Sequence, residues 1–134
     1  MKLTANFSKI EFNSRDGAVM PDEVLRNVKE LAENLQKVRD FLAEPLHINS
    51  GYRSPSHNRA IGGVSSSQHL LGKAADITTK NYTAKDLSLV FERMINNGEL
   101  KEGGVGLYNG FVHYDIRATR ARWNFSNRYK DFWK

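Results

Sequence analysis

Residues 104–117 read GVGLYNGFVHYDIR, and this stretch decides how the chain folds. Two short runs rich in Val, Leu, Tyr and Ile flank the Asn109–Gly110 pair. Asn-Gly favours the two-residue turn of a β-hairpin, because both central residues of that turn need a positive φ. The stretch therefore predicts two antiparallel strands joined at Asn109–Gly110.

The second run has two faces, because successive side chains of a strand point to opposite sides. One face is apolar and is predicted to join the core: Val112, Tyr114 and Ile116. The other face carries an aromatic ring, an imidazole, a carboxylate and a guanidinium: Phe111, His113, Asp115 and Arg117. From this strand alone, the polar row is either a solvated face or part of a functional site.

Helices and short strands precede the hairpin. Two helices are predicted from apolar residues at helical spacing, over 21–43 and about 84–97. Two short alternating segments, 46–50 and 74–78, are predicted to be strands, and in the second of them Asp76 points to the face opposite the core. This pattern predicts an α+β domain with a small, mainly antiparallel sheet and helices packed on it.

Length and composition narrow the possible classes of protein. Residues 1–134 are expected to form one domain, because the chain is long enough for one core and too short for two. The chain has no cysteine, so any metal must be held by His, Asp or Glu. No apolar stretch approaches the length of a membrane span, and the first residues lack the apolar centre of a signal peptide. We therefore expect neither a signal peptide nor membrane insertion.

The basic residues gather at the C-terminal end. The net charge is +5, and the segment 117–134 accounts for all of it. A basic segment with several aromatic residues could bind nucleic acid through phosphate contacts and stacking. We expect instead that this segment belongs to the domain, packs its aromatic residues on it and turns its arginines toward an anionic cell wall.

Three residues from separate segments form a candidate metal site. His69 lies in a loop rich in Ser and Gly, and Asp76 follows seven residues later on a strand. A bend at Gly72 can bring both side chains to one point. His113 completes a set of two imidazoles and one carboxylate, which is what a catalytic zinc with an open fourth position requires. Each residue also has an ordinary alternative, since a loop histidine is commonly solvated and an aspartate commonly caps a turn.

Three segments in order resemble a known group of proteins. SGYRS (50–54), SQHLLGKAADI (67–77) and FVHYD (111–115) resemble the zinc D-Ala-D-Ala carboxypeptidases, the vancomycin-resistance D,D-dipeptidases and the hedgehog signalling domain, which share one metal-binding fold. The resemblance runs from about Phe7 to Trp123 and is most marked to short single-domain members from phages and prophages, some of them endolysins. It implies a hedgehog/DD-peptidase-like fold with one zinc ion on the open face of the sheet.

The resemblance also implies roles for individual residues. Carried over position by position, it implies that His69, Asp76 and His113 bind the zinc. Arg53 corresponds to an arginine that stabilises the developing oxyanion or anchors the substrate. Gln68, next to the first zinc ligand, is a further candidate for contact with the substrate.

The general base is the part of the site that the sequence leaves open. Several relatives carry Asp or Glu three residues before the last metal-binding histidine, and here that position is Gly110, which cannot accept a proton. Asp115, on the same strand face as His113, is the candidate. It acts either as the base or as a residue that orients His113 or pairs with Arg117 or Arg53.

Together these features predict a monomeric zinc metallopeptidase that cuts peptidoglycan stem peptides, either as a D-Ala-D-Ala carboxypeptidase or as an endolysin-like endopeptidase of the L-Ala-D-Glu type. The resemblance implies a protein that stays in the cytoplasm until its release to the cell wall, or one associated with a phage. The alternative is a binding module that keeps zinc but has lost catalysis, which the hedgehog resemblance and the glycine at position 110 allow. No nucleic-acid partner is expected.

Overall fold

The structure is a computed structural model that describes residues 1–129. Within them, the sheet has five strands: β1 Leu46–Ser50, β2 Ala74–Thr79, β3 Gly104–Leu107, β4 Val112–Asp115 and β5 Ala121–Asn124. The helices are α1 Asp22–Leu42, α2 Pro55–Ala60 and α3 Ala84–Asn96, with short 3-10 helices at η1 Lys9–Phe12 and η2 Gln68–Leu71. The strand order is β1-β2-β4-β3-β5, and only β3 and β5 pair in parallel. The predicted α+β class is confirmed, and the sheet is mixed.

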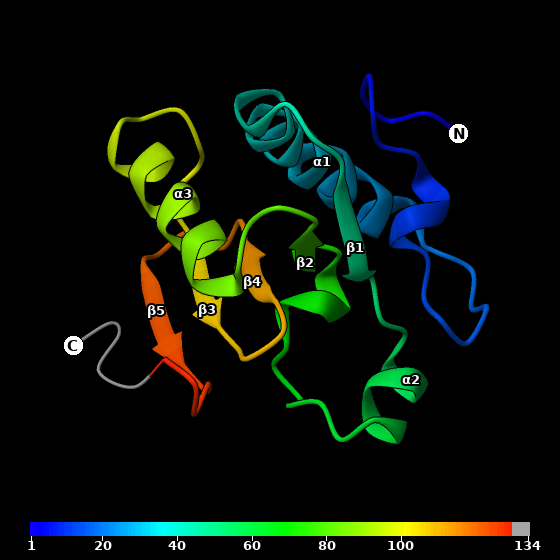
Figure 1. Cartoon of the computed structure of the whole chain (residues 1–134). Helices are drawn as coiled ribbons and strands as arrows, with labels where there is room; N and C mark the ends of the chain where they lie inside the picture. Colours follow the sequence, from blue (N-terminus) through cyan, green and yellow to red (C-terminus); the bar gives the residue numbers. More distant parts are fainter. Residues whose placement is uncertain (130–134) are drawn as a thin grey trace.

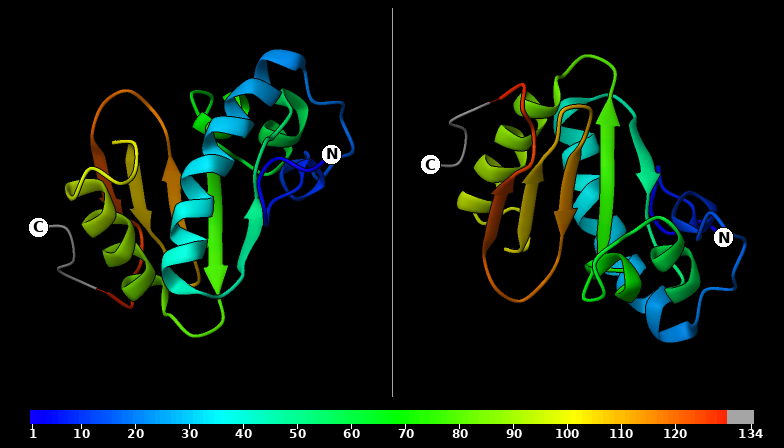
Figure 2. Two further views of the ribbon diagram at one scale, coloured as in Figure 1. Left: turned by 90° about the horizontal axis from the view of Figure 1, so that it is seen from above. Right: turned by 90° about the horizontal axis from the view of Figure 1, so that it is seen from below.

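The two long helices cover one face of this sheet. Figures 1 and 2 show α1 and α3 side by side on that face, while α2 lies on the other side. The core lies between these helices and the sheet, and its fully buried members include residues of α1, α3 and the strands: Val28, Leu31, Leu35, Leu87, Phe91, Ile77 and Tyr114. Because strand side chains alternate, the neighbours of the core residues on β2 and β4 point to the opposite, open face.

The helix α1 forms where the apolar spacing predicts it, because that spacing produces one continuous stripe. Val28, Leu31 and Leu35 from this stripe are buried, and each buried aliphatic side chain of this kind stabilises the fold by about 1.5–3 kcal/mol. The helix ends at Ala43, which adopts a left-handed conformation with φ 56° and donates its backbone N–H to Arg39. Within residues 1–129, no helix has the length and apolar character that crossing a bilayer requires.

The hairpin forms between β3 and β4, but its turn differs from the predicted one. Neither Asn109 nor Gly110 has a positive φ, so the argument from their turn type is wrong although the hairpin itself is confirmed. Asn109 has another part in the fold. Its side-chain oxygen accepts hydrogen bonds from the backbone N–H groups of Asn127 and Arg128, at 3.1 and 3.0 Å. The segment after β5 is thereby held against the hairpin turn.

Strand β5 has no counterpart in the sequence-based prediction, which left this region as a basic tail. Its Arg122 forms ion pairs with Glu92 of α3 at 2.6 Å and with Glu102 at 3.0 Å. The preceding Arg120 also lies 3.0 Å from Glu92. These two arginines are therefore paired within the chain rather than turned toward an outside anion. Residues 130–134 of the basic segment lie outside the described part of the chain.

Candidate metal centre

The three predicted metal ligands meet on the open face of the sheet. Strands β2 and β4 are neighbours, and their register sets Asp76 opposite His113. His69 comes from η2, and Gly72 directly after it has φ +74°, which turns the chain so that β2 begins beside η2. One ligand atom from each of His69, Asp76 and His113 lies within 4.8 Å of the others. The structure thus brings together residues that the chain supplies from two segments far apart.

Each imidazole has one nitrogen directed at Asp76 and the other held by a different partner. In His69, Nε2 lies 3.2 Å from Oδ1 of Asp76, while Nδ1 lies 2.7 Å from the carbonyl oxygen of Gly51, which can only accept a hydrogen bond. In His113 the roles are reversed, with Nδ1 3.2 Å from the same Oδ1 and Nε2 2.7 Å from Oδ2 of Asp115. Such outer partners fix which ring nitrogen is free to bind a metal.

The chemistry of this cluster fits a zinc ion. His69, Asp76 and His113 are all buried. Burial alone would raise the pKa of Asp76, but hydrogen bonds from His113 and His69 outweigh it and hold the pKa well below its usual range. The carboxylate is therefore ionised, as a ligand must be. Two imidazole nitrogens and one carboxylate oxygen suit zinc, whereas magnesium and calcium prefer oxygen ligands alone.

Arg53 reaches the same carboxylate from the side. Its Nη2 lies 3.4 Å from Oδ2 of Asp76, and its other nitrogens donate to Ser50 Oγ and Asn58 Oδ1, each at 3.3 Å. Its backbone N–H also donates to the carbonyl oxygen of His69 at 3.0 Å. These contacts hold Arg53 beside the cluster at the edge of the adjoining cleft.

Asp115 lies on the far edge of the His113 ring from Asp76, and both of its oxygens are occupied. Oδ2 is 2.7 Å from His113 Nε2 and 2.7 Å from Arg117 Nη2. Oδ1 accepts from the backbone N–H of Gly104 and from Arg117 Nε. Burial alone would raise the pKa of Asp115, but hydrogen bonds from His113 and Arg117 hold it well below its usual range. The imidazole ring stands between this carboxylate and the metal cluster.

The cluster opens into a cleft of about 510 Å³. One part of its lining is polar and comes from the segment that leads into η2: Gly63, Ser66, Ser67 and Gln68. A second part is aromatic and comes from the hairpin turn, β5 and the residue after β5: Tyr108, Phe111, Trp123 and Phe125. Among the described residues that line the cleft, Asp76 is the only carboxylate. Gly110, where relatives carry an acid, borders a separate, smaller hollow.

Trp123 is a residue of the site that sequence reasoning missed. Its ring lies over Gly106, where an added Cβ would stand 2.3 Å from ring atoms. The ring centroid is 4.9 Å from that of His113, and Nε1 donates a hydrogen bond to the hydroxyl of Tyr108 at 3.0 Å. Gly106 pairs with the proposed metal ligand His113. Because glycine has no side chain, its position beside His113 was the one indication in the sequence that a ring could lie there. The local sequence does not say which segment fills that space.

Comparison with known proteins agrees with this geometry. The chain matches the family model described as Peptidase M15 over residues 3–115, which is most of its length. The matched stretch contains His69, Asp76, His113, Arg53 and Asp115. No curated protein matches the chain.

Proposed function

Because the chain belongs to the peptidase M15 family, we propose that it is a zinc metallopeptidase that hydrolyses a peptide bond in the stem peptides of bacterial peptidoglycan. The family consists of zinc-dependent peptidases of cell-wall peptides, and the observation that carries the proposal is the convergence of two imidazoles and one carboxylate at the edge of a cleft. The candidate bonds are D-Ala–D-Ala and L-Ala–D-Glu. The resemblance to short endolysins extends the proposal to a monomeric, phage-type lytic enzyme.

His69 Nε2, His113 Nδ1 and Asp76 would hold the zinc. The bound ion would lower the pKa of a water molecule and polarise the scissile carbonyl group. Arg53 supplies a fixed positive charge beside Asp76 at the edge of the cleft, where it stabilises negative charge that develops on the carbonyl oxygen or anchors a carboxylate of the substrate. Gln68 lines the same cleft and would donate to or accept from the peptide backbone.

The role proposed for Asp115 is positioning rather than proton transfer. A general base must come within hydrogen-bond reach of the proton that it takes. Asp115 instead contacts the nitrogen of His113 that faces away from Asp76. Its carboxylate oxygens also accept hydrogen bonds from Arg117 and Gly104. This geometry supports the view that Asp115 orients His113.

A second candidate function is a zinc-containing binding module without catalysis. The observation that favours it is the shortage of acids, since Asp76 is the only carboxylate among the described residues that line the cleft. Gly110 occupies the position of the acid in several relatives and borders a different hollow. A module of this kind would bind the stem peptide and leave it uncut.

Digestion of purified peptidoglycan separates the two candidates. We expect the zinc-loaded protein, with about one zinc per chain, to release peptide fragments that mass spectrometry identifies, and we expect a chelator to abolish the release. His69→Ala should lose both zinc and activity. His47→Ala is the matched control, because His47 is an exposed histidine of β1 outside the cluster. Zinc bound without any fragment released would support the binding module, and a wild-type protein that binds no zinc would refute both.

A further inference from the structure

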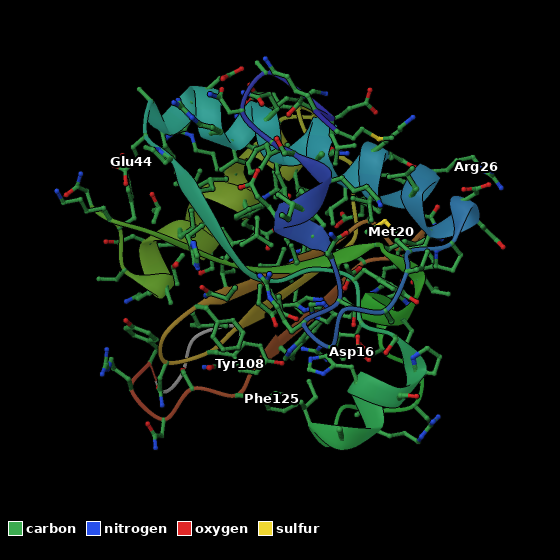
Figure 3. The ribbon with its side chains drawn as sticks, turned by 90° about the vertical axis from the view of Figure 1, so that its right-hand side faces the viewer. Asp16, Met20, Arg26, Glu44, Tyr108 and Phe125 are labelled. Atoms are coloured by element: carbon green, nitrogen blue, oxygen red, sulfur yellow. The ribbon has the colours of Figure 1, made fainter. Side chains whose placement is uncertain are left out.

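The aromatic part of the cleft is one connected unit, called here the aromatic wall: Tyr108, Phe111, Trp123 and Phe125. The rings of Tyr108 and Phe111 are stacked, with centroids 4.5 Å apart and planes 11° apart. Phe125 meets Tyr108 edge-on at 5.7 Å, and Trp123 donates its Nε1–H to the Tyr108 hydroxyl. Figure 3 shows Tyr108 and Phe125 together on the side of the sheet away from α1.

The aromatic wall begins at the metal cluster and extends away from it. The Trp123 ring lies 4.9 Å from the His113 ring, so this end touches a proposed zinc ligand. Phe125 lies two residues after Trp123, and at the rise of an extended chain this places its Cα about 7 Å from that of Trp123. If the scissile bond of a substrate lies at the metal, the neighbouring part of the substrate therefore contacts the aromatic wall.

The end of the wall at Phe125 is exposed apolar surface. Phe125 is 72% exposed, although its neighbours in the wall are partly buried. A stem peptide made largely of alanine and acidic residues brings single methyl groups and carboxylates to this surface. A hexosamine ring brings a flat C–H face and an acetyl methyl group, which suit the exposed face of an aromatic ring. The Tyr108 hydroxyl accepts from Trp123 and so keeps its own proton for donation to a sugar oxygen.

We propose that the aromatic wall binds the N-acetylated hexosamine that carries the stem peptide, and that the scissile bond is L-Ala–D-Glu, the candidate bond that lies nearer to that sugar. This inference rests on the proposed function and selects between its two candidate bonds. Each residue of an extended peptide spans about 3.3–3.6 Å. The L-Ala–D-Glu bond follows the first stem residue, whereas the terminal D-Ala–D-Ala bond lies three residues, or about 10 Å, further from the sugar. Only the nearer bond reaches the metal while the sugar contacts the wall.

The test uses two synthetic substrates that share one peptide, L-Ala-D-Glu-L-Lys, with and without an N-terminal N-acetylmuramyl group. We expect the zinc-loaded wild type to cut the L-Ala–D-Glu bond of both, with a kcat/KM about tenfold higher for the sugar-bearing substrate, which corresponds to ~1.4 kcal/mol. Phe125→Ala should remove most of this preference, chiefly by raising KM for the sugar-bearing substrate. Phe41→Ala is the matched control, because Phe41 is a 57% exposed phenylalanine of α1 outside the cleft.

Two results would overturn the inference: equal kcat/KM values for both substrates in the wild type, or an equal loss on both in Phe125→Ala. A parallel calorimetric titration of both substrates into chelator-treated protein measures binding without hydrolysis. If neither substrate is cut, the choice of the L-Ala–D-Glu bond fails, whereas the digestion of whole peptidoglycan decides the proposed function itself. Tighter binding of the muramyl peptide, lost in Phe125→Ala and kept in Phe41→Ala, would then still support the wall as a sugar site, and equal binding would refute it.

Discussion

At the scale of single residues, His69 and His113 use different ring nitrogens toward Asp76. The carbonyl oxygen of Gly51 holds the Nδ1–H of His69, and the carboxylate of Asp115 holds the Nε2–H of His113. Each outer contact therefore fixes the orientation of its ring and keeps the outer nitrogen protonated, so the nitrogen that faces Asp76 is the one that can bind a metal. The two histidines come from different elements, a 3-10 helix and a strand.

Asp115→Asn tests whether this carboxylate orients His113 or takes a proton. Asparagine keeps an oxygen that can accept from Nε2–H, but it lacks the charge that also holds Arg117. We expect the variant to bind zinc about 10–100-fold more weakly and to keep most of its activity once zinc is saturating. The measurements are a zinc titration and a peptidase assay at saturating zinc. A variant that is fully loaded but inactive would assign Asp115 the role of base.

At the scale of elements, the joint between η2 and β2 sets the site. Gly72 occupies this joint with φ +74°, and an added Cβ would stand 2.6 Å from Val24 Cγ1 and 2.8 Å from the Val24 carbonyl oxygen. The backbone conformation and the contact with α1 both exclude a side chain. A shift at this joint would separate His69 from Asp76, because they lie on either side of it.

Gly72→Ala should therefore destabilise the fold by at least about 1–2 kcal/mol, the cost of a left-handed conformation for a residue with a Cβ, and should weaken zinc binding. Urea unfolding and a zinc titration measure the two effects. Gly110→Ala is the matched control, since Gly110 has no positive φ and an added Cβ there meets nothing within 4 Å. We expect its stability to stay within about 0.5 kcal/mol of wild type. Similar losses in both variants would contradict this account of Gly72.

At the scale of the whole molecule, the N-terminal segment is tied to the loop that carries Arg53. The hydroxyls of Ser14 and Ser54 donate to Asp16 at 2.7 and 2.6 Å. Ser54 follows Arg53 and also accepts the N–H of His57 as the N-cap of α2. Asp16, labelled in Figure 3, thus joins the start of the chain to the edge of the cleft.

The hydrogen bonds that Asp16 accepts predict a pH dependence of stability. Hydrogen bonds from Ser14 and Ser54 lower the pKa of Asp16 from 3.8 to about 2. Because the folded value is lower, the carboxylate contributes stability above pH 4, and this contribution is lost as the pH falls toward 2. Metal-free wild type should melt at a higher temperature than Asp16→Asn at pH 5, and the difference should shrink as the pH falls toward 2. Glu33→Gln on α1 is the control, and a constant difference between wild type and Asp16→Asn would refute the linkage.

The sequence predicts those parts of this architecture that local patterns encode. The stripe of α1 and the alternation of β4 are such patterns, and both are confirmed. The pairing of β5 with β3 is not local, because its partners come from segments that share no turn and run in parallel. Neither the pairing nor the place of Trp123 beside His113 could be predicted. The contacts of Asp115 with His113 and Arg117 were among the predicted alternatives, whereas its contact with Gly104 of β3 was missed for the same reason.

The pairing of β2 with β4 also affects the rates of folding and unfolding. It joins Asp76 to His113 across 37 residues, and strands so distant along the chain pair slowly because a long loop must close first. The proposed zinc site is complete only once these strands have paired, so zinc that binds the complete site would not speed the pairing. Its stabilisation would instead appear as slower unfolding. The metal would then determine the rate of unfolding, while the strand order determines the rate of folding.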